Sequence, residues 1–160
     1  MLFISHRGNL DEPQPDLENT PEYIEFALWE GWDVEVDVWL VNNELHLGHD
    51  YPIVKMPEWY LDNNNLWFHC KNVEALQYFR RTSRIKYFWH QTDDYALTSN
   101  KKLWTYPGKK LVTGAIAVLP EQGYDGNLWD CHAICTDYVF KYKGDYEEYM
   151  RNIKRATEKL

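Results

Sequence analysis

The sequence predicts an α/β protein, a compact (β/α) barrel in which several of the connecting helices are shortened. Segments rich in β-branched and aromatic residues recur along the chain, and helical patterns separate several of them. The chain has 160 residues, whereas a full eight-stranded barrel typically takes about 250 residues. We therefore expect one domain over residues 1–160, with some helices reduced to loops or single turns.

Seven segments have the composition and length of strands, and an eighth strand is expected in a hairpin. Their residues are largely Val, Ile, Leu, Phe, Tyr and Trp, most of which favour the pleated, half-buried surface of a sheet. The seven segments are residues 2–5, 34–40, 66–70, 86–90, 103–106, 115–119 and 133–139. A short strand over 43–47 is expected to follow the second segment and to form a hairpin with it.

Helical signals lie between some of these strands and at the end of the chain. The first expected helix follows Pro21, which suits a first helical position, and the second follows Asn72, which can cap it. The third carries Lys and Arg late in its length, where the helix dipole favours cations. The stretches 91–99 and 120–126 leave room for one short turn each. The expected helices are residues 22–30, 73–81 and 145–160.

The composition limits the function classes. Asp and Glu number 25 against 17 Lys and Arg, and the net charge of −8 disfavours a non-specific grip on nucleic acid or anionic membranes. We expect no secretory leader and no stretch that spans a bilayer. Three cysteines without zinc-finger spacing predict reduced thiols in a cytoplasmic protein. A metal site within residues 131–135, CHAIC, is the less favoured alternative to a short apolar strand there.

The stretch DVEVDVWLVNNELHLGHD, residues 33–50, carries the strongest chemical signal. Side chains alternate along a strand, so Glu35 and Asp37 share one face while the valines between them face the other way. Two neighbouring carboxylates repel each other unless they are protonated, paired or metal-bound. Oxygen ligands at this spacing suit Mg²⁺ or Ca²⁺. For this strand considered alone, a solvated hairpin face is the alternative interpretation.

Two other expected strands also end in ionisable side chains. His6 and Arg7 follow the first strand, and histidine transfers protons near neutral pH while arginine binds phosphate bidentately. His69 and Lys71 lie on one face near the end of the third strand. Barrel active sites are formed where the strands end. Three such strand ends therefore predict one shared site.

These motifs resemble those of the glycerophosphodiester phosphodiesterase family, within the broader PLC-like phosphodiesterase superfamily. The matching residues stand in the family's order and at suitable spacing, and the match thins beyond Asp50. The resemblance implies a metal-dependent phosphodiesterase on a TIM-type barrel, here in reduced form. The matching motifs are His6-Arg7-Gly8, Glu18-Asn19-Thr20, Glu35-Val36-Asp37 and His49-Asp50.

The resemblance also implies roles for individual residues. His6 and His49 would be the general acid/base pair, Arg7 would bind the phosphate, and Lys71 would help to neutralise it. Carboxylates of the second strand would hold a divalent metal ion. The implied ligands are Glu35, Asp37 and, in place of a third family carboxylate, His69.

The histidine at position 69 is a departure from the family pattern. An imidazole in place of a carboxylate removes a negative charge and moves the metal preference from Mg²⁺ or Ca²⁺ towards Mn²⁺ or Zn²⁺. The chain is also shorter than the family's, so its substrate loops must be reduced. A small phosphodiester is the expected partner, but the sequence does not single out a glycerophosphodiester.

Several other residues are secondary candidates for the site or its surroundings. His90 ends another strand, where lining the pocket and packing are equally consistent with the sequence. Asp137 is a weaker candidate for the barrel mouth, and Trp104 for its wall. Glu18 is expected to orient Arg7 or the helix start. His46 is expected on the hairpin surface.

Other functions stay open. In a cyclising phosphodiester lyase, a hydroxyl of the substrate itself attacks phosphorus. In a non-catalytic module, a degenerate barrel without its third carboxylate would bind phosphate or stack sugars on its aromatic residues. The two histidines favour an enzyme, because a pure binding module has no need of an acid/base pair. Processing of phosphate-linked sugars is permitted by the sequence, which does not indicate the oligomeric state.

Overall fold

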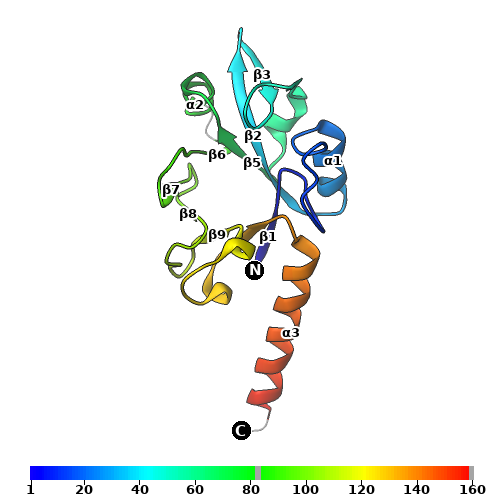
Figure 1. Cartoon of the computed structure of the whole chain (residues 1–160), viewed down its shortest axis with the longest axis vertical. Coiled ribbons are helices and arrows are strands. Elements are labelled where there is room, and N and C mark those ends of the chain that lie inside the picture. The colour runs from blue at the N-terminus through cyan, green and yellow to red at the C-terminus, as the bar shows by residue number, and fades with distance from the viewer. Residues whose placement is uncertain (82–83, 159–160) are drawn as a thin grey trace.

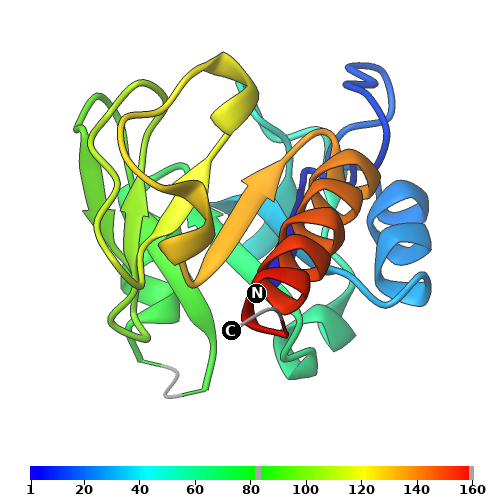
Figure 2. The ribbon, with the colours of Figure 1, turned by 90° about the horizontal axis from the view of Figure 1, so that it is seen from below.

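The computed structural model describes residues 1–81 and 84–158. Its centre is a strongly curved sheet, which Figure 1 shows with the long axis of the molecule vertical and Figure 2 shows from below. The first strand, β1 (Leu2–His6), pairs in parallel with β2 (Asp33–Val41) on one side and with β10 (Ala133–Thr136) on the other. The first strand of the chain therefore lies in the middle of the sheet, as it does in folds built from parallel crossovers.

Two wings extend from this centre. On one side β2 pairs with β5 in parallel, and β5 pairs with β6. On the other side β10, β9 and β8 follow in parallel, and β7 pairs with β8 antiparallel. The bounds of these strands are Leu66–Cys70 for β5, Lys86–Trp89 for β6, Tyr95–Leu97 for β7, Leu103–Thr105 for β8 and Ile116–Val118 for β9.

The predicted TIM-type barrel is wrong. The sheet is mixed and forms a half-barrel, and among the described residues no ladder joins β6 to β7 or β8. The two edges are joined by side chains and by Ser99 instead. Ser99 N–H donates to the Tyr87 carbonyl (2.8 Å), Tyr87 N–H donates to Ser99 Oγ (3.0 Å), and the ring of Phe88 stacks on that of Trp104. The reason lies in residues 90–102. They form an antiparallel strand, β7, where we had expected a single turn, and so provide no helical crossover between β6 and β8.

The helices follow the predicted pattern with one boundary corrected. Helix α1 (Pro21–Trp29) and helix α2 (Val73–Phe79) lie where they were expected. Helix α3 (Val139–Thr157) begins before the predicted residue 145 and takes Val139, which we had assigned to a strand. Val139 and Tyr142 are buried, so tertiary packing overrides the β propensity of valine. Residues 159–160 of the predicted helix lie outside the described residues.

The hairpin after β2 forms as expected and is short. Strand β3 (Glu44–Leu47) pairs antiparallel with β2, and Asn42 and Asn43 turn the chain with φ angles of 51° and 63°. Asparagine tolerates this left-handed region better than most residues. The 3₁₀ turn η2 (Pro120–Gln122) lies in the stretch 120–126, where one short turn was expected. The smaller elements that the sequence did not indicate are β4 (Val54–Lys55) and the 3₁₀ turns η1 (Glu58–Asp62) and η3 (Leu128–Asp130).

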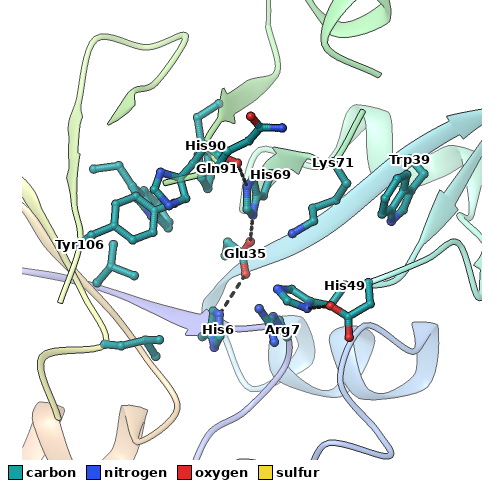
Figure 3. Close-up of a pocket in the computed structure, with 15 residues that line it drawn as sticks. His6, Arg7, Glu35, Trp39, His49, His69, Lys71, His90, Gln91 and Tyr106 are labelled. Atoms are coloured by element: carbon teal, nitrogen blue, oxygen red, sulfur yellow. Dashed lines mark hydrogen bonds and ion pairs between the residues drawn. The ribbon is translucent and has the colours of Figure 1, made fainter. Parts of the chain in front are cut away.

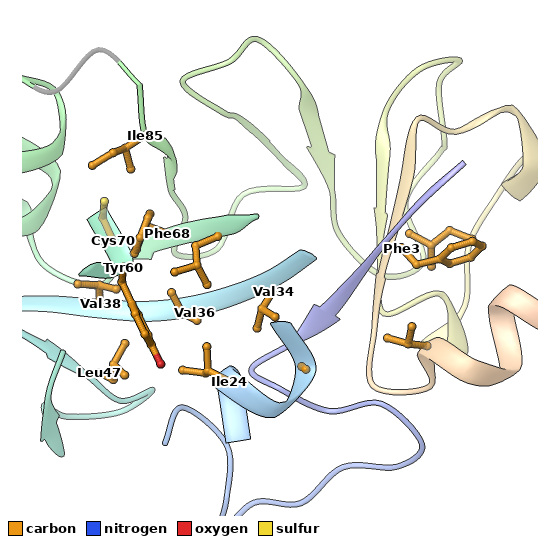
Figure 4. Packing of buried hydrophobic residues seen from close by; sticks show 14 of the residues in the cluster. Phe3, Ile24, Val34, Val36, Val38, Leu47, Tyr60, Phe68, Cys70 and Ile85 are labelled. Carbon is orange, nitrogen blue, oxygen red and sulfur yellow. The ribbon is translucent and has the colours of Figure 1, made fainter. Parts of the chain in front are cut away.

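Two apolar clusters lie on the two faces of the sheet. The outer cluster joins the sheet to the helices, and the alternation of β2 places Val34, Val36 and Val38 in it (Figure 4). The inner cluster fills the concave side with large aromatic side chains such as Trp67 and Trp104. Because the valines of β2 face outward, its carboxylates face the concave side. None of the helices in the described part of the chain has both the length and the apolar character that a bilayer crossing requires.

Candidate functional site

The carboxyl ends of β1 and β5 lie beside the middle of β2, which runs between them, at the concave side of the sheet. The strand register pairs His6 of β1 with Glu35 of β2, and Asp37 of β2 with His69 of β5. In parallel strands, residues paired in register lie side by side. Side chains 63 positions apart in the sequence therefore form one cluster, as Figure 3 shows for His6, Glu35 and His69.

These strand ends line a cavity of about 500 Å³. It contains six of the seven candidate residues from the sequence: His6, Arg7, Glu35, His49, His69 and Lys71. The seventh, Asp37, lies beneath the cavity and is fully buried. His90, which the sequence left open between lining and packing, and Trp104 also line the cavity.

Glu35, Asp37 and His69 each offer a ligand atom within 4.8 Å of the others. The Nδ1 atom of His69 lies 2.9 Å from Asp37 Oδ1 and 3.6 Å from Glu35 Oε1. Glu35 Oε2 is buried without a hydrogen-bond partner among the described residues, and the nearest imidazole nitrogen, His6 Nε2, is 4.0 Å away. An unpartnered carboxylate oxygen in the interior is costly. A cation between these three groups would satisfy it.

The hydrogen bonding of His69 supports the same conclusion. Its Nε2 lies 3.2 Å from the backbone carbonyl of His90, which can only accept, so Nε2 carries the hydrogen. The other ring nitrogen, Nδ1, then faces Asp37 and Glu35, where a lone pair suits a bound cation and an N–H bonds to Asp37. That arrangement is favourable only with a proton or a cation in between, and ligating histidines commonly donate their other N–H to a carbonyl in this way. Two carboxylates and an imidazole fit Mg²⁺, Mn²⁺ or Zn²⁺.

The two carboxylates differ in their partners. Burial raises the pKa of Glu35, and the charge of Asp37 raises it further. Burial also opposes ionisation of Asp37, but the hydrogen bond from His69 and the charges of Arg7 and Lys71 outweigh it and hold the pKa of Asp37 well below its usual range. The cluster thus combines a charge-paired carboxylate with one that lacks a cationic partner of its own.

Arg7 and Lys71 supply fixed positive charge. Arg7 Nε lies 2.9 Å from Asp37 Oδ2, its Nη1 donates to Glu18 Oε2 over 3.0 Å, and Lys71 Nζ lies 3.4 Å from Asp37 Oδ1. Glu18 therefore orients Arg7, one of the two roles that the sequence suggested for it. The backbone of Arg7 is left-handed, with φ at 56°, which turns its side chain into the site at a cost in strain.

Gly8 is required by the same turn. Its φ is 100°, and a Cβ atom there would come within 2.6 Å of the Tyr23 ring. Asn19, also left-handed with φ at 60°, completes the support of the cluster. Its side chain donates to Asp37 Oδ2 and accepts from the Asp37 backbone N–H, both at 2.9 Å. The Asn19 contact was not predicted as a site contact, although it lies within the Glu-Asn-Thr motif.

His6 has a partner from the far end of the chain. Its Nδ1 lies 2.8 Å from Asp137 Oδ1, at the end of β10, and Asn9 donates to the same oxygen over 2.8 Å. Burial opposes protonation of His6, but the hydrogen bond to Asp137 and the charge of Glu35 outweigh it and raise its pKa. The pair fixes the ring, with Nδ1 facing Asp137 and Nε2 facing Glu35. Asn9 gave no signal in the sequence.

His49 sits differently from His6. Its side chain is 43% exposed, and its Nδ1 lies 2.8 Å from the carboxylate of the adjacent Asp50. Burial and the nearby charge of Arg7 lower its pKa. It lies at the cavity rim on the side of Arg7 and Lys71 (Figure 3). Trp39 fixes this loop, because its indole N–H donates to the Gly48 carbonyl over 2.6 Å.

The opposite side of the cavity is aromatic. His90 and Tyr106 stack with ring centroids 3.3 Å apart, and the His69 ring stacks on Phe88 at 4.8 Å. Burial and the charge of His69 lower the pKa of His90 to about 4. His90 is therefore neutral near neutral pH.

Two other sequence candidates lie outside the cavity. His46 contacts the Glu44 carbonyl of its own hairpin (3.1 Å) and does not line the cavity. Cys131 and Cys135 are free, buried thiols, and the described residues of that stretch form no group of metal-ligating side chains. The apolar interpretation of CHAIC therefore fits the structure.

Comparisons of the chain with family models, with curated proteins and with solved structures found no match. The likeness to glycerophosphodiester phosphodiesterases therefore stays an expectation from the N-terminal motifs.

Proposed function

We propose that this protein is a divalent-metal-dependent phosphodiesterase that cleaves a small phosphodiester, with a site similar to that expected for glycerophosphodiester phosphodiesterases. One observation carries the proposal. A buried cluster of two carboxylates and an imidazole shares a cavity with two fixed cations and two further histidines. Cleavage of a phosphodiester needs this combination, because negative charge on phosphorus must be stabilised and two protons must be moved.

Glu35, Asp37 and His69 are the residues that would hold the metal ion. When bound, a divalent ion supplies Lewis-acid polarisation of a phosphoryl oxygen. Arg7 binds the anionic diester through Nη2, because its Nε and Nη1 face Asp37 and Glu18 and Nη2 has no protein partner among the described residues. This modifies the expected bidentate phosphate contact.

The two histidines carry the protons. The Nδ1 atom of His6 faces Asp137, so its Nε2 is the atom that exchanges a proton with the substrate. His49 is fixed through Nδ1 by Asp50 and likewise has Nε2 for proton transfer. One ring accepts a proton from the nucleophile and the other donates one to the leaving oxygen. Lys71 adds positive charge beside Asp37.

The test is a titration of Mg²⁺, Mn²⁺, Ca²⁺ and Zn²⁺ against bis(p-nitrophenyl) phosphate and a panel of glycerophosphodiesters. Turnover that depends on added metal and is abolished by a chelator supports the proposal. Metal-independent turnover, or none with any metal and any diester, would contradict it. Detection of a cyclic phosphate product would identify the lyase alternative, in which the same residues act on an internal hydroxyl.

A second candidate is a phosphate-binding module without catalysis. The observation in its favour is that Arg7 and Lys71 already neutralise Asp37 without a metal ion. This candidate predicts that inorganic phosphate binds in the presence of a chelator and that no diester is turned over. If the protein is a phosphodiesterase, tight binding of inorganic phosphate should instead require the divalent ion.

A further inference from the structure

The cavity has a wall of two stacked rings and a leucine side chain that the proposed chemistry does not use. His90, Tyr106 and Leu119 form this wall, at the ends of β6, β8 and β9, over the buried rings of Phe88 and Trp104. Figure 3 shows His90 and Tyr106 on one side of Glu35, and Lys71 and His49 on the other. The side chains that would bind phosphate, Arg7 and Lys71, thus lie on the side of the cavity away from this wall.

Leu119 adds an independent sign of function. Its φ and ψ angles are 43° and 55°, in the left-handed region that a leucine rarely adopts, and it precedes a proline, which restricts it further. Backbone strain of this kind persists where the surroundings enforce it, and it gathers at ligand sites. Glycine or asparagine would relieve the strain. The leucine side chain is nonetheless present, and it lines the cavity.

The surroundings of Leu119 hold it firmly. Its N–H donates to the Cys135 carbonyl (2.8 Å), and its own carbonyl accepts from Gln122 N–H (2.9 Å). The next turn is tied to β10 through Glu121, which accepts from Thr136 Oγ1 at 2.9–3.0 Å and from the Asp137 backbone N–H at 3.0 Å. The strand end that positions His6 through Asp137 therefore also positions Leu119.

We propose that the wall formed by His90, Tyr106 and Leu119 is a subsite for a flat, uncharged ring on one ester arm of the substrate, and that Leu119 sets this specificity. The proposal rests on the phosphodiesterase function and deepens it, because it names the substrate class as an aryl-type phosphodiester. A phosphate bound at Arg7 and Lys71 has two ester arms. The polar rim suits a hydroxylated arm, while the rings and the leucine side chain of the wall suit an aromatic ring.

The test compares phenylphosphonate with methylphosphonate, measured by calorimetry with saturating Mn²⁺. Both carry the same phosphonate group on a carbon that is not hydrolysed, so the difference between them reports the ring alone. We expect phenylphosphonate to bind about tenfold tighter or better in the wild type. Leu119→Asn keeps a similar size, tolerates the left-handed backbone and introduces polarity. It should reduce the preference to about threefold or less.

The matched control is Leu97→Asn, the same change at an exposed position of β7 outside the cavity. It should keep the full preference, and methylphosphonate should bind equally to all three proteins. Equal affinities of the two phosphonates for the wild type, or a preference that survives Leu119→Asn, would overturn the subsite and leave the phosphodiesterase standing. Failure of both phosphonates to bind the metal-loaded wild type would overturn both proposals. The wild-type ratio is decisive even if the variant is unstable.

Discussion

The two wings of the sheet contribute different kinds of side chain to the cavity. The central strand β1 and the wing of β2, β5 and β6 have strands of four to nine residues, helices α1 and α2 on the outer face, and the candidate metal-binding cluster on β2 and β5. The wing of β9, β8 and β7 has strands of three residues, joined by turns, and contributes only uncharged side chains to the cavity. The longer strands thus position the charged groups, and the short strands, together with His90 after β6, form the opposite wall of the cavity.

The largest expected difference between the two faces of the sheet is in the free energy of unfolding when a buried ring is removed. Phe79 of α2 is fully buried between other rings, while Phe88 of β6 is equally buried but borders the cavity. Phe79→Ala should lower the free energy of unfolding by about 3–5 kcal/mol, and Phe88→Ala by an amount near or below the lower end of that range. Ligand binding should show the reverse order, because the ring of His69 stacks on Phe88.

Chemical denaturation gives the stabilities, and calorimetry with Mn²⁺ gives the metal affinities. If Phe79→Ala weakened the metal site more than Phe88→Ala did, the division between a structural outer cluster and a functional inner face would be wrong.

The next effect concerns the two histidines. His6→Ala and His49→Ala should each lower kcat by at least about 10²-fold while metal binding persists, because each removes a positioned proton-transfer group. The double variant should lose little more than the worse single variant, since groups that act as a unit are not additive. Steady-state kinetics on the best diester substrate provides the measurement.

A substrate with p-nitrophenolate as leaving group needs little acid catalysis, so it should partly rescue one of the two variants. That rescue identifies the general acid. Near wild-type turnover of both alanine variants on a diester with a poor leaving group would remove the acid/base role and favour the binding module.

A smaller effect concerns pH and the His6–Asp137 pair. The raised pKa of His6 stabilises the fold fully below its unfolded value near 6.5, and this contribution is lost as the pH rises through the folded pKa. Burial opposes the ionisation of Asp137, but its bond with His6 lowers its pKa, so its contribution is present above 3.8 and is lost as the pH falls through the folded pKa. The pair is therefore most stabilising between these two values.

Thermal unfolding in a chelator should show this window in the wild type. Asp137→Asn should flatten it, because the variant no longer favours the charged imidazole. An unchanged pH profile in Asp137→Asn would mean that the pair contributes nothing to stability.

The sequence predicts the charged wing better than the apolar wing. Glu35 and Asp37 alternate with valines on a long strand, and His6 and His69 stand at the ends of strands, so periodicity alone brings them towards one rim. The β7 region has only a short polar and aromatic stretch, which does not distinguish a turn from an antiparallel strand.

Long-range partners were harder to predict. Asp137 reaches His6 across 131 positions in the sequence, and only the pairing of β1 with β10 brings them together. The closed barrel failed for the same reason, because closure depends on whether residues 90–102 form a crossover. Local propensity does not decide that question.

The central claim is that Glu35, Asp37 and His69 hold a divalent metal, and Glu35→Gln tests it most directly. Glu35 is a buried carboxylate with an unpartnered oxygen, so removing its charge should leave the metal-free protein at least as stable as the wild type. Mn²⁺ should raise the thermal midpoint of the wild type and of the exposed control Glu44→Gln, but not that of Glu35→Gln. An equal rise in Glu35→Gln would contradict the metal site.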